Sequence, residues 1–230
     1  SKKWIEDFQR LEYLIIIFTR RLLSFVDAVP VTPGPFSMFR SWVFKPLGNF
    51  DETNIVEDHE MALRIQSANY KIRSSIDADV FTEAKNNMAD LLKQRVRWHR
   101  GGLHNTFKYN CMMSPKYGDF GVLVMPLMIV SVVTLFAVLA INIIELANNF
   151  FLSQRLGWDV FYLSLSPLTV LSIFIALISA FWAYSAISTF KEETKNPIMI
   201  FIYLLFYWYL MIAYNVLTFA KEIKKESFSW

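Results

Sequence analysis

Three long apolar stretches dominate the second half of the hydrophobic pattern. They contain no charged residue and are Gly121–Ile144, Val160–Phe190 and Pro197–Ala220. Each exceeds the roughly 18 residues that indicate a transmembrane helix, and a soluble core is disfavoured because little polar surface remains to cover all three. We therefore expect a membrane region over residues 119–230. Its expected spans are roughly residues 121–146, 160–187 and 197–220.

The first 118 residues carry shorter and more polar patterns. Apolar residues recur at helical spacing in Lys3 to about Val26, Ile55 to about Ala68 and Asn86 to about Asn105. A short strand-like run at Phe36–Phe39 and an alternating run at Tyr70–Val80 predict strands. We therefore expect residues 1–118 to form an α/β unit. Its helix at about residues 86–105 has the Arg and Trp content of a helix that lies at a membrane interface.

Charge separates the same two parts. Of 43 charged residues, 31 lie at or before Asp119, and the other 111 residues hold 12. The net charge of +3 argues against a nucleic-acid partner, which requires a strongly basic surface. The single cysteine, Cys111, excludes an intrachain disulfide framework. Because the chain begins at Ser1 without signal-peptide features, we expect an internal start within a longer protein.

An acidic pair, Glu57–Asp58, opens the second expected helix. Carboxylates at a helix N-terminus are stabilised by the free N–H groups and the helix dipole, which is a purely structural reading. The functional reading makes Asp58 a general base that takes a proton from an incoming hydroxyl group. An adjacent acidic pair alone does not decide between the two.

A second cluster lies on the third expected helix, where Gln94, Arg97 and Trp98 share one face. Arg97 has the geometry to bind phosphate oxygens, Gln94 offers a further hydrogen bond, and Trp98 offers a flat surface for a sugar ring. An interfacial helix also favours Arg and Trp, and both readings can hold together. The loop from Gly34 to Arg40 is either a plain turn or a wall of an acceptor pocket.

The order of these segments carries more information than any one of them. A Pro/Gly loop ending at Arg40, then Glu57–Asp58, Thr82–Glu83, Gln94–Trp98 and the apolar stretches resembles the processive inverting membrane glycosyltransferases. These are the cellulose, chitin, hyaluronan and poly-N-acetylglucosamine synthases and their relatives. Glu57–Asp58 matches the xED motif of that family, with Val56 where Thr is common, and Gln94–Trp98 matches its QxxRW motif.

The resemblance implies the C-terminal half of a GT-A glycosyltransferase domain and a role for each matching residue. Asp58 would be the general base, and Glu57 would help to position the site. Gln94 and Arg97 would hold the pyrophosphate of a nucleotide sugar, a UDP-sugar in many relatives. The acceptor would be bound by Trp98, Gly34, Pro35 and Arg40.

The resemblance also implies a divalent metal, Mg or Mn, with its ligands in a DxD motif that precedes xED. Asp77-Ala78-Asp79 looks like a DxD but follows Glu57–Asp58, so we read it as a solvated strand end. The three histidines do not have the spacing of a metal set, and we assign no metal ligand in this chain.

The expected partners are a nucleotide-sugar donor, a glycan or lipid-linked acceptor and the lipid bilayer. We expect an integral protein of the plasma membrane whose first part, which holds most of the Lys and Arg, faces the cytosol. Two alternatives stay open. One is a transferase that adds a single sugar to a lipid, and the other is a non-catalytic membrane scaffold or transporter subunit.

Overall fold

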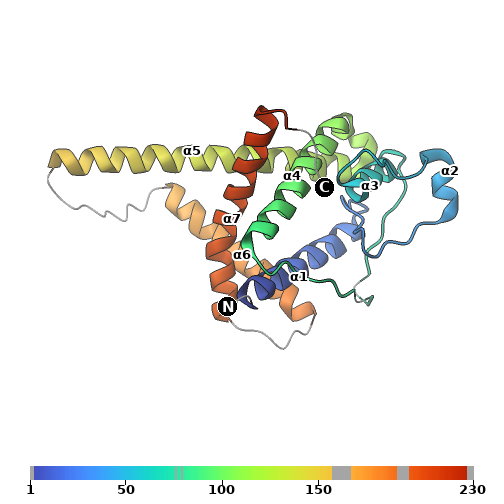
Figure 1. Cartoon of the computed structure of the whole chain (residues 1–230), viewed down its shortest axis with the longest axis horizontal. Helices are drawn as coiled ribbons and strands as arrows, with labels where there is room; N and C mark the ends of the chain where they lie inside the picture. Colours follow the sequence, from blue (N-terminus) through green and yellow to red (C-terminus); the bar gives the residue numbers. More distant parts are fainter. Residues whose placement is uncertain (1–2, 76, 79, 157–166, 191–196, 227–230) are drawn as a thin grey trace.

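The structure, a computed structural model, describes residues 3–75, 77–78, 80–156, 167–190 and 197–226, and these are organised as helices and loops. Its α-helices are α1 (Lys3–Phe25), α2 (Phe44–Leu47), α3 (Glu57–Ser67), α4 (Met88–Lys108), α5 (Met125–Leu156), α6 (Pro167–Thr189) and α7 (Pro197–Ile223). A π-helical turn, Phe120–Val124, precedes α5. Helix α5 runs out from the other elements, which gather around α1 and α4 (Figure 1).

The expected α/β class is not confirmed, because the residues that the structure describes contain no strand. Phe36–Phe39 is loop, and the described part of Tyr70–Val80 is irregular. A strand needs a neighbouring strand to satisfy its backbone groups. Here the Ser74 carbonyl accepts a hydrogen bond from the side chain of Arg21 in α1 instead of from a neighbouring strand. The alternating pattern reflects one-sided burial, in which Ile72 enters the core.

Two helices of the described residues are long and apolar enough to cross a membrane, namely Val170–Thr189 and Ile200–Ile223. Within the first expected span, the residues that the structure describes give a shorter apolar helix, Phe120–Thr134, so the count of three spans is not confirmed. The predicted span was defined by a stretch of sequence without charged residues, whereas α5 itself continues through Glu145 to Leu156. Residues 160–166 of the second expected span lie outside the described residues.

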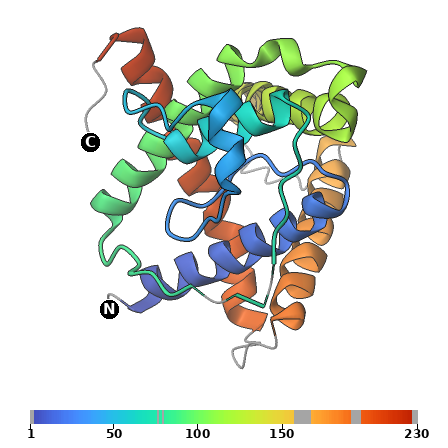
Figure 2. The ribbon, with the colours of Figure 1, turned by 90° about the vertical axis from the view of Figure 1, so that its right-hand side faces the viewer.

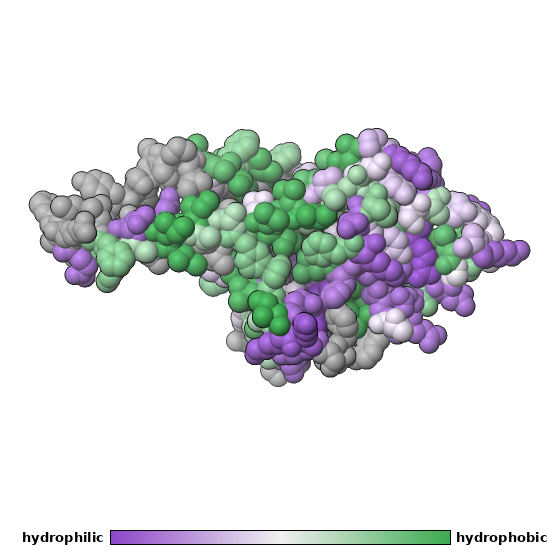
Figure 3. Space-filling model, turned by 90° about the horizontal axis from the view of Figure 1, so that it is seen from above, coloured by the Kyte–Doolittle hydropathy of each residue, from purple (hydrophilic) through white to green (hydrophobic). Residues whose placement is uncertain are grey.

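Helix α1 joins the polar part of the chain to the apolar helices. Its first half buries Phe8 and Leu11 against Ile187 of α6 and Tyr203 of α7. In Figure 2, α1 lies across α6 and α7. Figure 3 shows the result at the surface, where hydrophobic residues cover the middle of the molecule and hydrophilic ones gather at the end that carries α2 and α3. Helix α1 therefore fixes the polar end relative to the apolar helices.

Helix α4 is anchored at its start by polar contacts. Asn87 caps it by accepting from the Asp90 N–H at 2.8 Å, as short polar side chains do at helix starts. The preceding loop is held to α1, because buried Gln9 donates to the Lys85 carbonyl at 2.7 Å and accepts from the Lys85 N–H at 3.0 Å. The helix that carries the QxxRW motif is thus fixed against α1.

Candidate functional site

Asp58 lies in the first turn of α3, which begins at Glu57. The Gly34 N–H donates to its Oδ2 at 3.2 Å, and the His59 N–H donates to its Oδ1 at 2.7 Å. The Thr32 hydroxyl donates to the Asp58 carbonyl at 2.9 Å. The structure therefore brings together Asp58 and Gly34, two of the predicted site residues, and holds the Pro/Gly loop on the helix start.

The surroundings of Asp58 favour its protonated form more than water does. Burial raises the pKa of Asp58, and the nearby charge of Glu57 adds to this, whereas the N–H groups of His59 and Gly34 and the charge of Arg20 oppose it. A raised pKa suits a carboxylate that must accept a proton. Arg20 was not singled out from the sequence, because its proximity to Asp58 depends on how α1 packs in the folded chain.

The start of α3 rests directly on α4. A Cβ atom added to Gly101 would lie 2.2 Å from Val56 Cγ2, so α4 can approach this closely only with glycine there. Asn54 donates to Asn105 Oδ1 at 2.7 Å, and Asn105 donates to the Val56 carbonyl at 3.3 Å. The peptide that leads into Glu57 is thereby fixed against α4.

The other motif lies on the same side of α4. Gln94, Arg97 and Trp98 precede Gly101 by seven, four and three residues, which places all four along one helical face. Because Gly101 contacts the residue before Glu57–Asp58, the QxxRW side chains extend from that contact along α4. The two motifs, far apart in the sequence, therefore belong to one packed unit.

Pro35 and Arg40 are less closely tied to this unit. Pro35 follows Gly34 in an exposed turn, and Arg40 is exposed just before the 3-10 turn Ser41–Val43. No hydrogen bond or ion pair described for the chain joins Arg40 to Asp58. Of the predicted acceptor-side loop, the structure thus brings Gly34 to Asp58 and leaves Arg40 at the surface.

A buried carboxylate that sequence reasoning missed, Glu60, fastens α3 to its surroundings. It pairs with Arg64 and accepts from the Tyr109 hydroxyl at 2.6 Å and from Lys108 Nζ at 3.2 Å. Burial alone would raise the pKa of Glu60, but the hydrogen bonds from Arg64, Tyr109 and Lys108 outweigh burial and lower it. Glu60 therefore stays ionised and holds the helix in place.

The described residues do not supply a ligand set for the divalent metal that the resemblance implies, since they contain no group of three or more His, Cys, Asp or Glu side chains placed to hold one. Asp77 is exposed in a bend, and Asp79 lies outside the described residues. The histidines are dispersed, with His59 between α3 and α4 and with His99 and His104 contacting α7.

His59 gives this region a dependence on pH. Burial lowers the pKa of His59 to about 4, with Glu60 opposing, and its Nε2 has no hydrogen-bond partner. In the unfolded chain His59 takes up a proton below about pH 6.5, whereas in the folded protein it does so only near pH 4. The free energy of unfolding is therefore at its full value above pH 6.5, and the titration of His59 lowers it by up to about 3 kcal/mol as the pH falls toward 4.

We therefore expect the melting temperature of the detergent-solubilised protein to fall between about pH 7 and pH 5, and to fall less in a His59→Gln variant. Intrinsic fluorescence during a thermal ramp measures both. An equal decrease in the two proteins would show that His59 is not the group responsible.

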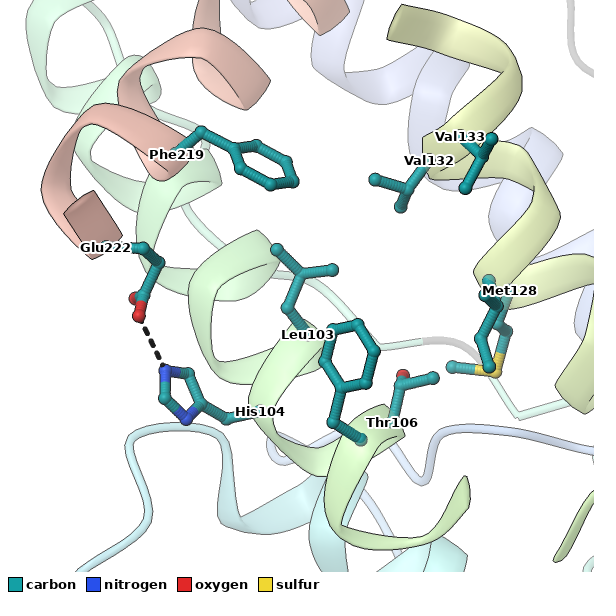
Figure 4. Close-up of a pocket in the computed structure, with 10 residues that line it drawn as sticks. Leu103, His104, Thr106, Met128, Val132, Val133, Phe219 and Glu222 are labelled. Atoms are coloured by element: carbon teal, nitrogen blue, oxygen red, sulfur yellow. Dashed lines mark hydrogen bonds and ion pairs between the residues drawn. The ribbon is translucent and has the colours of Figure 1, made fainter. Parts of the chain in front are cut away.

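An apolar cavity of about 580 Å³ lies on the opposite face of α4, where α5 and α7 approach it (Figure 4). Its walls include Leu103, Phe107, Met128, Val132 and Phe219. At one side His104 Nε2 lies 3.0 Å from Glu222 Oε2 (Figure 4). A charged sugar nucleotide would lose its hydration among these side chains, so this cavity does not suit such a ligand.

Comparison with known proteins identifies related glycosyltransferases. The model of the family described as glycosyl transferase family group 2 matches residues 1–220. Two poly-beta-1,6-N-acetyl-D-glucosamine synthases of Staphylococcus epidermidis are 24% identical over 226 residues and 23% identical over 231 residues, each match covering 95% of the chain. The chain spans 53% of the length of each relative. No solved structure gives a significant match. Because the family match covers nearly the whole sequence, the chain belongs to glycosyl transferase family group 2.

Proposed function

We propose that this chain is the acceptor-side part of a membrane glycosyltransferase that adds sugars from a nucleotide-sugar donor to a growing glycan, with inversion at the anomeric carbon. The observation that carries the proposal is the setting of Asp58. It is partly buried, its pKa is raised, and it is fixed by the Gly34 N–H beside the helix that bears the QxxRW motif. Both relatives carry the name of a polysaccharide synthase, which favours a glycan acceptor.

The proposed chemistry is a single displacement. The acceptor hydroxyl gives its proton to Asp58, whose carboxylate oxygens each keep a lone pair beyond the N–H bonds that they accept. The hydroxyl oxygen bonds to the anomeric carbon as the bond to the nucleoside diphosphate breaks, which inverts the configuration. Arg97 and Gln94 would bind the leaving pyrophosphate. Since the described residues offer no ligand set for the implied metal, no step is assigned to it.

The proposed setting is the plasma membrane, with the polar end in the cytosol. Helices α6 and α7 are long and apolar enough to cross a bilayer, and α1 ties them to the polar end. A cytosolic site has access to nucleotide sugars, and UDP-N-acetylglucosamine is the first donor to test because the relatives are named for a polymer of N-acetylglucosamine.

The function is tested with membranes that contain the full-length protein and radiolabelled UDP-N-acetylglucosamine. We expect polymer to form, and we expect Trp98→Ala to raise the acceptor KM by about tenfold and to shorten the product, because a stacking surface is lost. Binding of the donor should be unchanged.

The matched control is Trp4→Ala, which removes an exposed tryptophan at the start of α1. It should elongate like the wild type. The acceptor role of Trp98 would be contradicted if Trp98→Ala bound the donor less well while the donor-bound variant still elongated the product normally.

A further inference from the structure

The first arginine of the QxxRW segment, Arg95, is a buried charge without an assigned role. Arg95 is 1% exposed and pairs with Glu12 of α1, which is 4% exposed. The partners are 83 residues apart in the sequence, so the pair joins α1 to α4. Its Nε has no hydrogen-bond partner, which means that Glu12 only partly satisfies the guanidinium.

Arg95 also lies against the tryptophan of the same motif. Its Cζ is 4.2 Å above the ring of Trp98 and 5.7 Å from the ring of Tyr13. A cation over an aromatic face is attracted by the ring, and the attraction grows when both groups are removed from water. The guanidinium therefore covers one face of the indole.

Stability does not explain why such a pair is present. Burial raises the pKa of Glu12 above its ordinary value even though Arg95 lies beside it, so the cost of removing the carboxylate from water exceeds what the pairing returns. Apolar side chains of similar size often stabilise a fold as well as a buried ion pair does, whereas an ion pair defines one geometry. What the ion pair provides beyond apolar packing is a defined position for Arg95.

We propose that the Glu12–Arg95 pair positions Trp98, covering one face of its indole and directing the other toward the acceptor sugar. Glu12 and Arg95 are positioning residues, because they act through Trp98 and do not touch the reacting atoms. The assignment of the free face to a sugar rests on the proposed function. The positioning of the indole does not, since it follows from the contacts of Arg95 alone.

The test uses a double variant of the full-length protein in membranes, Glu12→Leu with Arg95→Met. It removes both charges together, so no unpaired charge stays buried and the packing volume is kept. Hydroxyl-radical labelling of Trp98, read by mass spectrometry with and without an N-acetylglucosamine oligosaccharide, reports the exposure of the indole directly. Acceptor KM and donor KM are measured on the same membranes.

In the double variant, we expect Trp98 to be labelled faster without sugar and to lose its protection by the oligosaccharide. The acceptor KM of this variant should be about tenfold higher than that of the wild type, with an unchanged donor KM. Arg95→Lys, which keeps a cation beside Glu12 but loses the planar group, should lie between the variant and the wild type.

The matched control is Glu222→Leu with Arg100→Met, since that pair also fastens α4 but lies on its opposite face. Labelling and protection in this control should equal those of the wild type. Wild-type labelling in the Glu12/Arg95 variant, or the same changes in both double variants, would overturn the positioning role. Absence of transfer by the wild type would instead reject the proposed function, while the labelling rates would still decide whether Arg95 positions Trp98.

Discussion

Asp58→Asn should lower the rate of sugar transfer by about 100- to 10,000-fold, the usual contribution of a general base. The amide keeps the size of the side chain and can still accept from the Gly34 N–H, but it cannot take the proton of the acceptor hydroxyl. Initial rates with labelled nucleotide sugar measure the loss, and equilibrium binding of the donor should be retained. A normal rate in this variant would show that Asp58 is not the base.

The matched control for Asp58 is Asp90→Asn. Asp90 is also a carboxylate in the first turn of a helix, but it is exposed on α4. Both substitutions remove the favourable interaction of a negative charge with a helix N-terminus, so they separate the structural reading of Glu57–Asp58 from the catalytic one. We expect Asp90→Asn to transfer sugar at close to the wild-type rate. Equal losses in the two variants would favour the structural reading.

The pH profile gives an independent check on the same carboxylate. Because burial raises the pKa of Asp58, the base becomes protonated, and therefore inactive, at a higher pH than an ordinary aspartate. As the pH is lowered, the kcat/KM of the wild type should therefore begin to fall at a higher pH than the pH at which an exposed carboxylate takes up a proton. The residual activity of Asp58→Asn should lack this limb.

Gly101→Ala should separate α3 from α4. The added Cβ would lie 2.2 Å from Val56 Cγ2 and 3.3 Å from Val56 Cβ, so either the helix or the residue before Glu57 must move. Overpacking of this kind costs about 1–3 kcal/mol, and the movement would also displace Asp58 from the QxxRW side chains. We expect a lower melting temperature and a lower transfer rate, measured by thermal denaturation and by product formation.

Two further variants make the Gly101 test specific. Gly102→Ala adds the same atom one residue later, where it would only reach ordinary contact with His59 at 3.9 Å, so it should be tolerated. Combining Gly101→Ala with Val56→Ala removes the closest clash and should recover part of the lost stability, which a double-mutant cycle measures. Equal effects of the two glycine substitutions would contradict the close packing of α3 on α4.

The helices of the polar part could be predicted from the sequence because each buries one face. The expected helices at Lys3–Val26, Ile55–Ala68 and Asn86–Asn105 correspond to α1, α3 and α4 within about three residues at each end. Alternation is a weaker signal, since it records only that one side of a segment is buried. A strand also needs a pairing partner, and none is present among the described residues.

The candidate site could be proposed from the sequence where its pattern is local, and parts of it were missed where they depend on long-range contacts. The spacing of Gln94, Arg97 and Trp98 predicts their shared face, and the resemblance to the family motif led to Asp58 as the proposed base. The pairing of Arg95 with Glu12 and the proximity of Arg20 to Asp58 arise because α1 folds back beside α3 and α4. No periodicity within either segment reports such a contact, so only the tertiary structure reveals it.

The packing of α1 against α6 and α7 has a practical consequence for anyone who wishes to isolate the polar part. Phe8 and Leu11 are covered by residues of the two apolar helices, and Trp182 of α6 donates to the Thr19 hydroxyl at 2.9 Å. A polypeptide ending near Gly118 would expose this seam to water and would tend to aggregate. The polar part therefore depends on the apolar helices for its solubility, and purification is best attempted with both retained in detergent.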